Sequence, residues 1–197
     1  FTVLPKLGVA GNSAIMNVEP VFAGIERVTP AGLLLADGSE IELDAIVYAT
    51  GFDPANYLAG IEVQGPSGKL EQTWADGARA HLGVTVSGFP NLFFMYGPNT
   101  NVAGSIVHMH ECQARYIVQC LQAMQARRAR SMDVRAHVMQ ASCEAIQSRL
   151  RASVADASHC RSYMMDRNGR VVTNYPGSQS DYERETLRLD AAEYVFA

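Results

Sequence analysis

The stretch DAIVYATGFD, Asp44–Asp53, decides how the first part of this chain is expected to fold. Its segment Ala45–Tyr48 is continuously apolar, which is typical of a strand that is covered on both faces. A second stretch, LFFMYGPNTN at Leu92–Asn101, predicts another buried strand that ends in a turn before a long helix. Because small turn residues leave the backbone accessible, these two strand ends predict a place where a cofactor contacts the main chain.

Hairpins and helices surround these two strands. An Asp-Gly pair at Asp37-Gly38 and an Asn-Gly pair at Asn168-Gly169 are strong hairpin signals. Apolar residues at helical spacing predict helices over about Ala103–Arg127 and Arg135–Ala155. A capping box from Ser180 to Glu183 is expected to start a short helix that runs to Arg188 in an otherwise irregular tail. Short strands are expected at Gly24–Val28, Leu33–Ala36, Ile41–Leu43, Ile61–Val63 and Val171–Thr173. The order predicts an α/β or α+β fold with β-hairpins, two long helices and a domain boundary near Ala49–Asp53.

Composition limits the classes of function. The 197 residues are 48% hydrophobic and 18% charged, which is ordinary for a globular protein, and the net charge of −4 argues against nucleic-acid and anionic-membrane partners. No apolar run is long enough to span a bilayer, and the four cysteines form no CxxC pair. We therefore expect a cytoplasmic protein with reduced thiols. The chain begins with Phe1 rather than Met, which suggests a fragment.

The turn Gly97–Asn101 is the stronger of the two candidate sites. It lies between a predicted buried strand and a helix N-terminus, where free N–H groups and the positive end of the helix dipole favour an electron-rich group such as a flavin edge. The alternative is that Asn99, Thr100, Asn101 and Ser105 are simply turn and capping residues. Both interpretations stay open at this point. The tripeptide Ala49-Thr50-Gly51 alone is a weaker signal, and a plain strand-ending turn explains it.

A metal site is a minor alternative. His108, His110, Glu111 and Cys112 are close in sequence, but on a helix only His108 and Cys112 share a face. No second ligand pair occurs at zinc-like spacing, so we expect no metal. GxSxG, Walker A and GxGxxG motifs are absent from the sequence.

Taken together, four segments resemble the C-terminal part of class B flavoprotein monooxygenases, and most closely Baeyer–Villiger monooxygenases of the 4-hydroxyacetophenone monooxygenase type. The segments are IVYATGFDPANYL (Ile46–Leu58), TWADGARAHLGVTVSGFPNLFFMYGPNTN (Thr73–Asn101), HECQARYIV (His110–Val118) and CRSYMMDRNGRVVTNYPGSQSDY (Cys160–Tyr182). They occur in family order from about Gly24 to the end, which is specific for the family and not for a substrate.

This resemblance implies a Rossmann-like fold with two dinucleotide-binding domains, for FAD and NADPH. Residues 1–48 would end the NADPH-binding domain, 49–155 would form the C-terminal half of the FAD-binding domain, and 156–197 would wrap over the active-site cleft. Tyr163 stands where the family often has Trp, and Tyr175 stands where Trp-Pro-Gly is common. The implied cofactor-binding residues are Thr50, Gly51, Phe52, Asn99, Asn101, Ser105, Ile106 and Val107, and those of the substrate or nicotinamide pocket are Val102, Ala103 and Tyr163.

The implied reaction is insertion of one oxygen atom from O2 into a ketone, or oxidation of a soft heteroatom, through a flavin peroxide. The family's active-site arginine neighbourhood, its FxGxxxHxxxWP fingerprint and both dinucleotide-binding Gly motifs are not in this chain. We therefore expect no catalytic residue here, no activity of the chain alone, and the missing N-terminal half of the same protein as a partner. The alternatives are a non-catalytic ligand-binding or interaction module, with an exposed apolar face covered in a homo-oligomer, and a disulfide reductase, which the missing CxxC disfavours.

Overall fold

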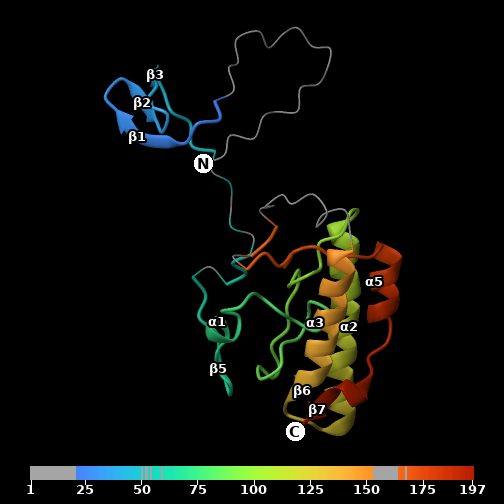
Figure 1. Cartoon of the computed structure of the whole chain (residues 1–197). Helices are drawn as coiled ribbons and strands as arrows, with labels where there is room; N and C mark the ends of the chain where they lie inside the picture. The colour runs from blue at the N-terminus through green and yellow to red at the C-terminus, as the bar shows by residue number, and fades with distance from the viewer. Residues whose placement is uncertain are drawn as a thin grey trace. The chain divides into compact units, whose positions relative to one another are not determined.

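The computed structural model describes residues 21–49, 51, 53, 55–58, 60–152, 164–166 and 168–197. The chain divides into two compact units, Phe1–Phe52 and Asp53–Ala197 (Figure 1). The division falls inside the boundary region that the Gly-containing break at Ala49–Asp53 predicts. The assignment of these units to the NADPH- and FAD-binding domains stays a prediction.

The first unit contains a three-stranded antiparallel sheet in the order β1-β2-β3. Its strands are β1 (Ile25–Thr29), β2 (Gly32–Leu35) and β3 (Glu40–Glu42). The Asp37-Gly38 turn connects β2 to β3 as predicted: Gly38 has a φ of +85°, and the backbone N–H of Ser39 donates to Asp37 Oδ1 at 3.0 Å. The predicted hairpins of this region are therefore confirmed.

The predicted buried strand at Ala45–Tyr48 is wrong. This segment has no strand structure, and Val47 and Tyr48 are 87% and 76% exposed. A strand needs a neighbour that takes up its N–H and C=O groups, and a continuously apolar strand needs cover on both faces. Among the described residues, neither is provided for this segment.

The second unit is built on two long helices, as predicted. They are α2 (Ile106–Arg127) and α3 (Ala136–Arg151), and both lie in the same part of Figure 1 as α5 (Gln179–Thr186). The remaining elements are α1 (Leu70–Thr73), the 3-10 helix η1 (Ala191–Glu193) and the strands β4 (Gln64–Gly65), β5 (Gly68–Lys69), β6 (Met132–Val134) and β7 (Tyr194–Phe196). Among the described helices, none combines the length and the hydrophobicity that a transmembrane span requires.

The main core of this unit joins α2 to the antiparallel β6–β7 pair. Tyr116 and Cys120 of α2 pack against Met132, Val134 and Tyr194, all of which are at most 3% exposed. The hydroxyl groups of Tyr116 and Tyr194 lie 3.0 Å apart and hydrogen-bond to each other. The last strand of the chain therefore belongs to the core, and the prediction of an irregular tail is wrong there. The cysteines Cys112, Cys120 and Cys143 are free and buried, and Cys160 lies outside the described residues.

Further predictions of secondary structure need correction. The strands predicted at Ile61–Val63 and Val171–Thr173 are not formed: β4 begins only at Gln64, and the second segment contributes only an isolated bridge from Val171 to Met165. Leu92–Tyr96 forms no strand and contributes only an isolated bridge from Phe93 to Thr85. The backbone leaves the extended region on either side of this bridge, because Asn91 and Tyr96 have φ values of +63° and +59°. The cap of the short helix α5 is Ser178, not Ser180.

The capping box of α5 begins two residues before the predicted one. The Ser178 side chain accepts from the backbone N–H of Asp181, and the Asp181 carboxylate accepts from the backbone N–H of Ser178. Asp therefore takes the place of the Glu on which the sequence prediction relied. The helix ends at Thr186, before the predicted Arg188.

Candidate functional site

The first turn of α2 is exposed and has unused backbone donors. Ser105 is the N-cap, and its side chain accepts from the backbone N–H of His108 at 3.3 Å. The N–H groups of Ile106 and Val107 have no acceptor within the helix, and the two residues are 42% and 66% exposed. In the part of the chain that the structure describes, this helix end therefore presents two N–H groups without an acceptor, together with the positive end of the helix dipole.

Helix α5 fixes the chain just before this turn. The side-chain amide of Gln179 donates to the backbone carbonyl of Ser105 at 2.8 Å. The same side chain packs on Gly104, which has a φ of +146° and where an added Cβ would lie 2.7 Å from Gln179. The positive φ of Gly104 favours glycine, whereas the contact with Gln179 involves the end of a flexible side chain.

The Gly97–Asn101 turn is buried and is held by the segment Val171–Tyr175. Asn99 has a φ of +58°, and its side-chain N–H groups donate to the carbonyls of Val171 and Asn174 at 2.8 and 2.9 Å. Its backbone N–H donates to the carbonyl of Val172 at 2.8 Å. Both amide hydrogens of Asn99 are thus used within the protein, which leaves its side-chain carbonyl as the group available to a ligand. That Asn99 binds a cofactor stays a prediction.

Asn101 makes a second connection to the same segment. Its side-chain N–H donates to Asn174 Oδ1 at 2.9 Å, and its Oδ1 accepts from the Tyr96 hydroxyl at 3.3 Å. The backbone pairs in parallel with Asn174. Val102, next in the chain, is 7% exposed and packs in a small core with Tyr182, whereas Ala103 is exposed.

Two cavities lie near this turn, and Tyr57 lines both. The smaller one has a volume of about 100 Å³ and is lined by Tyr57, Tyr96, Gly97, Thr100, Asn101, Met164 and Thr173. The Tyr57 hydroxyl donates to the backbone carbonyl of Val172 at 2.9 Å. Burial raises the pKa of Tyr57 above its ordinary value, and the neighbouring Tyr96 adds to the rise. Tyr57 is therefore a neutral hydrogen-bonding group between the two cavities.

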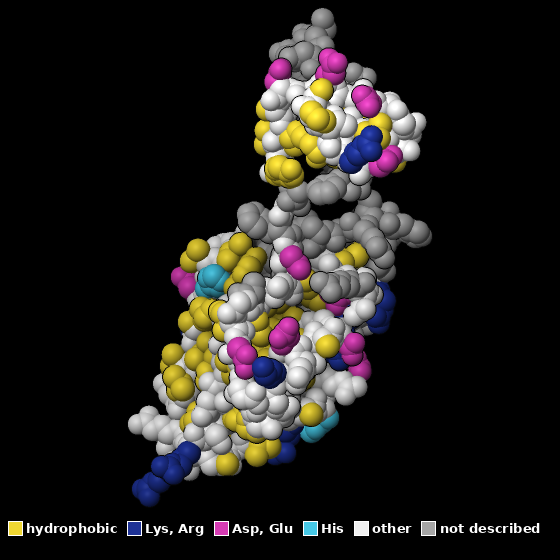
Figure 2. All heavy atoms as spheres, turned by 90° about the vertical axis from the view of Figure 1, so that its left-hand side faces the viewer, with side chains coloured by type: hydrophobic (Ala, Val, Ile, Leu, Met, Phe, Trp, Pro, Cys, Tyr) yellow, Lys and Arg dark blue, Asp and Glu magenta, His cyan; other side chains and the backbone are white. Residues whose placement is uncertain are grey.

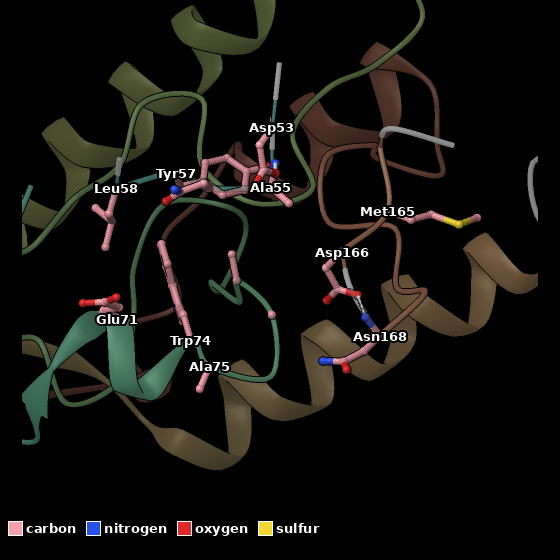
Figure 3. Close-up of a pocket in the computed structure, with 13 residues that line it drawn as sticks. Asp53, Ala55, Tyr57, Leu58, Glu71, Trp74, Ala75, Met165, Asp166 and Asn168 are labelled. Carbon is pink, nitrogen blue, oxygen red and sulfur yellow. Dashed lines mark hydrogen bonds between the residues drawn. The ribbon is translucent and has the colours of Figure 1, made fainter. Parts of the chain in front are cut away.

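The larger cavity has a volume of about 310 Å³ and an acidic lining. Figure 3 shows Tyr57 and Trp74 on one side of it and Asp166 and Asn168 on the other. Asp53 and Glu71 add two more carboxylates, and none of the described lining residues has a basic side chain. Such a lining favours a neutral or cationic ligand over a phosphate.

One carboxylate oxygen at this cavity is buried without a hydrogen-bond partner. Asp166 Oδ1 accepts from the backbone N–H groups of Asn168 and Arg170, both at 2.9 Å, whereas Oδ2 has no donor. A Cβ at Gly77, which has a φ of +105°, would lie 2.2 Å from this Oδ2, so any larger residue would have to displace the Asp166 carboxylate. Asp166 is a polar group that the sequence reasoning missed, because its Asn-Gly hairpin was interpreted only as a turn.

The remaining predicted residues are distributed as follows. Gly51 belongs to the first unit and has a φ of +80°, with nothing within 4 Å of an added Cβ. Thr50, Phe52 and Tyr163 lie outside the described residues. Gly51 and the α2 turn belong to different units, so their joining at one flavin stays a prediction.

The residues of α2 that could ligate a metal separate as the helical spacing predicts. His108 and Cys112 share a face, and His110 instead packs edge-on against the Tyr96 ring, with 5.6 Å between the ring centroids. The fold adds Glu183 of α5 to His108 and Cys112. No local sequence signal points to Glu183, because it is far away along the chain.

The chain is similar to known flavin monooxygenases. It is 35% identical to a Baeyer-Villiger monooxygenase of Streptomyces coelicolor over 90% of this chain and 35% of that protein. It is 32% identical to the FAD-binding monooxygenase ktnD of Aspergillus niger, over 91% of this chain and 30% of that protein. A structure of oxidized steroid monooxygenase bound to NADP matches 92% of this chain and 36% of its own, with a TM-score of 0.76 and 27% identity.

The chain thus spans about a third of the length of the curated relatives it matches. No family model matches it.

Proposed function

We propose that this chain forms the C-terminal third of a flavoprotein of the Baeyer–Villiger monooxygenase family, an enzyme that uses FAD and NADPH. The enzyme would insert one oxygen atom from O2 into a ketone or transfer it to a soft heteroatom. Bound FAD, once reduced by NADPH, supplies the oxygen-activating chemistry. The residues of this chain would hold the flavin, shape the substrate cavity and exclude water from it.

The exposed first turn of α2 is the observation that carries this proposal. The residues present fit a flavin, because two N–H groups without acceptors and a positive dipole end suit an electron-rich ring edge. The turn that precedes them is rigid, since Asn99 and Asn101 tie it to Asn174 through hydrogen bonds of 2.9 Å. A rigid backbone that ends in free donors is the kind of preorganised support that binds a ring in one orientation.

The outer face of α2 indicates that further protein covers this unit. Val107, Ala114, Val118 and Leu121 share one side of the helix by their spacing, and all four are exposed. A row of exposed apolar side chains of this kind indicates a buried interface. Hydrophobic side chains also gather on the face of this unit that Figure 2 presents. We assign the α2 face to contact with the missing part of the same polypeptide.

The test replaces a single N–H group at the helix start. Proline is tolerated at the first position of a helix when the residue before it is extended, so Ile106→Pro removes the N–H and keeps the fold. Ser105 is extended, with φ −88° and ψ 114°. Ala136→Pro is the matched control, because Ala136 begins α3 after Arg135, which is extended at φ −64° and ψ 135°.

Both variants are made in the protein extended by its upstream coding region. We expect Ile106→Pro to weaken FAD retention and slow ketone-dependent NADPH oxidation, and Ala136→Pro to do neither. Mass spectrometry of an ester or a sulfoxide product separates ketone from heteroatom oxidation. Equal effects of the two variants would contradict the assignment of α2 to the flavin. An upstream region without dinucleotide-binding Gly motifs would favour the non-catalytic module.

A further inference from the structure

Three metal-ligating side chains meet where α5 packs on α2. His108 and Cys112 lie one turn apart on α2, and Glu183 comes from α5. His108 Nε2 lies 3.7 Å from Cys112 Sγ and 3.7 Å from Glu183 Oε2, and the three ligand atoms all lie within 4.8 Å of one another. We propose that this His108–Cys112–Glu183 cluster binds a zinc-class divalent cation that ties α5 to α2. The proposal is independent of the proposed function.

The distances fit a tetrahedral zinc ion. Bonds of about 2.3 Å to sulfur and about 2.0–2.1 Å to nitrogen and oxygen place sulfur about 3.6 Å from nitrogen and nitrogen about 3.4 Å from oxygen. The measured separations of 3.7 Å exceed these by a few tenths of an ångström at most. Rotation of the Glu183 side chain, which ends in two equivalent oxygens, closes the remaining sulfur–oxygen distance. The backbones of α2 and α5 need not move.

The chemistry and burial of the donors also fit. Sulfur, imidazole nitrogen and carboxylate oxygen form a mixed set that zinc accepts, and a thiolate with a carboxylate balances its double charge. Cys112 is fully buried, whereas the side chains of His108 and Glu183 are 31% and 39% exposed. The cluster is therefore open on one side, where an ion enters and a water molecule completes the fourth position.

Replacing Arg115 can distinguish a metal site from a simple ion pair, because Arg115 occupies the position that a metal ion would take. Its Nη2 donates to Cys112 Sγ at 3.3 Å and to Glu183 Oε1 at 2.9 Å, so a guanidinium already lies against two of the three ligands. The hydrogen bond from Arg115 also lowers the pKa of Glu183. Because the Arg115 side chain is 53% exposed, it can turn out to solvent when a metal ion enters. Arg115 and the metal ion therefore compete.

Cobalt and zinc titrations of the purified, chelator-treated protein test this site. Co²⁺ is expected to bind one per chain, with a thiolate-to-cobalt charge-transfer band and the visible bands of tetrahedral cobalt. Zn²⁺ added afterwards should remove these bands. Isothermal titration with Zn²⁺ then gives the affinity, which should fall as the pH is lowered because the bound thiol must lose its proton.

Three ligand variants and one competitor variant make the test specific. His108→Ala, Cys112→Ser and Glu183→Gln should each weaken Zn²⁺ binding by more than about tenfold. Arg115→Ala should strengthen it by about tenfold, because a competing positive charge is removed. An ion pair alone predicts no such gain. Circular dichroism establishes that each variant keeps its helices.

His110→Ala and Cys143→Ser are the matched controls. His110 is on another face of α2, and Cys143 is a buried thiol of α3 that bonds to the Ala80 carbonyl. Neither should change the affinity. The proposal is overturned if no thiolate–cobalt band appears, if the ligand variants bind zinc as the unaltered protein does, or if Arg115→Ala leaves the affinity unchanged or lowers it.

Discussion

Acidification tests whether His81 is buried as a neutral ring. The His81 side chain is 5% exposed, and its ring packs edge-on against Tyr194 with 6.1 Å between the ring centroids. Burial lowers the pKa of His81 from 6.5 to about 4. Glu193 Oε2, at 3.2 Å from His81 Nε2, attracts a protonated ring and opposes this shift. The effect of burial on His81 outweighs this attraction. Burial also raises the pKa of the Glu193 carboxyl and so favours the neutral form of Glu193, which attracts the ring less.

The direction of the pH effect follows from the two pKa values. Between pH 6.5 and about 4 the unfolded chain binds a proton at His81 that the folded chain does not. The free energy of unfolding therefore falls as the pH is lowered through this window. Linkage gives a loss of about 2 kcal/mol between about pH 7.5 and about pH 5, and about 3 kcal/mol once the folded ring is protonated as well. These magnitudes are upper values, because Glu193 attracts the protonated ring.

Urea unfolding at a series of pH values measures this loss. Carboxylates also titrate in this pH range and contribute to the same curve. The quantity of interest is therefore the difference in pH dependence between the unaltered protein and His81→Gln, whose side chain does not titrate. We expect the pH-dependent part of about 2 kcal/mol to disappear in His81→Gln, whatever that variant loses at neutral pH. The control is His137→Gln, which removes an exposed histidine. If both replacements change the pH profile equally, or neither does, the burial argument is refuted.

Three further predictions concern stability. Ser178→Ala removes the cap of α5 and should lower the free energy of unfolding by about 1 kcal/mol in urea titrations, whereas Ser180→Ala, outside the capping box, should have a smaller effect. Asn99→Ala removes two hydrogen bonds to the 171–174 segment and should cost about 2 kcal/mol, with faster proteolysis of that segment; Asn99→Gly should cost less, because glycine adopts the positive φ. Tyr182→Phe leaves the carbonyl of Leu82 without the donor it now has at 2.7 Å, and should cost about 1–2 kcal/mol by the same measurement.

Local signals in the sequence predicted the helices and tight turns correctly. The apolar spacing of α2 and α3 and the Asp37-Gly38 and Asn168-Gly169 turns depend on residues within a few positions of one another. Helical period and turn chemistry are local properties, so one sequence is enough to recognise them. The exposed first turn of α2 was predicted for the same reason. The α5 cap was misplaced by two residues because Asp181 replaces the expected Glu.

The strand predictions that were wrong depended on partners elsewhere in the chain. Ala45–Tyr48 and Leu92–Tyr96 are apolar enough for strands, but no strand forms without a neighbouring strand to pair with. Conversely, β6 and β7 pair although Val134 and Tyr194 are 60 positions apart (194 − 134). The sequence gives no register for such a pairing. Glu183 joined His108 and Cys112 for the same reason, through the packing of α5 on α2.

The polar residues of the Gly97–Asn101 turn also change what a cofactor can contact. Asn99 and Asn101 stay predicted cofactor ligands, and their amide N–H groups bind the 171–174 segment. The donors that stay free belong to the backbone at Ile106 and Val107. Backbone donors are the same for every residue except proline, so side-chain replacements at Ile106 should be tolerated as long as the helix start is kept. If the flavin lies in front of α2, its binding depends on the stiffness of the turn behind the helix more than on the side chains that face it.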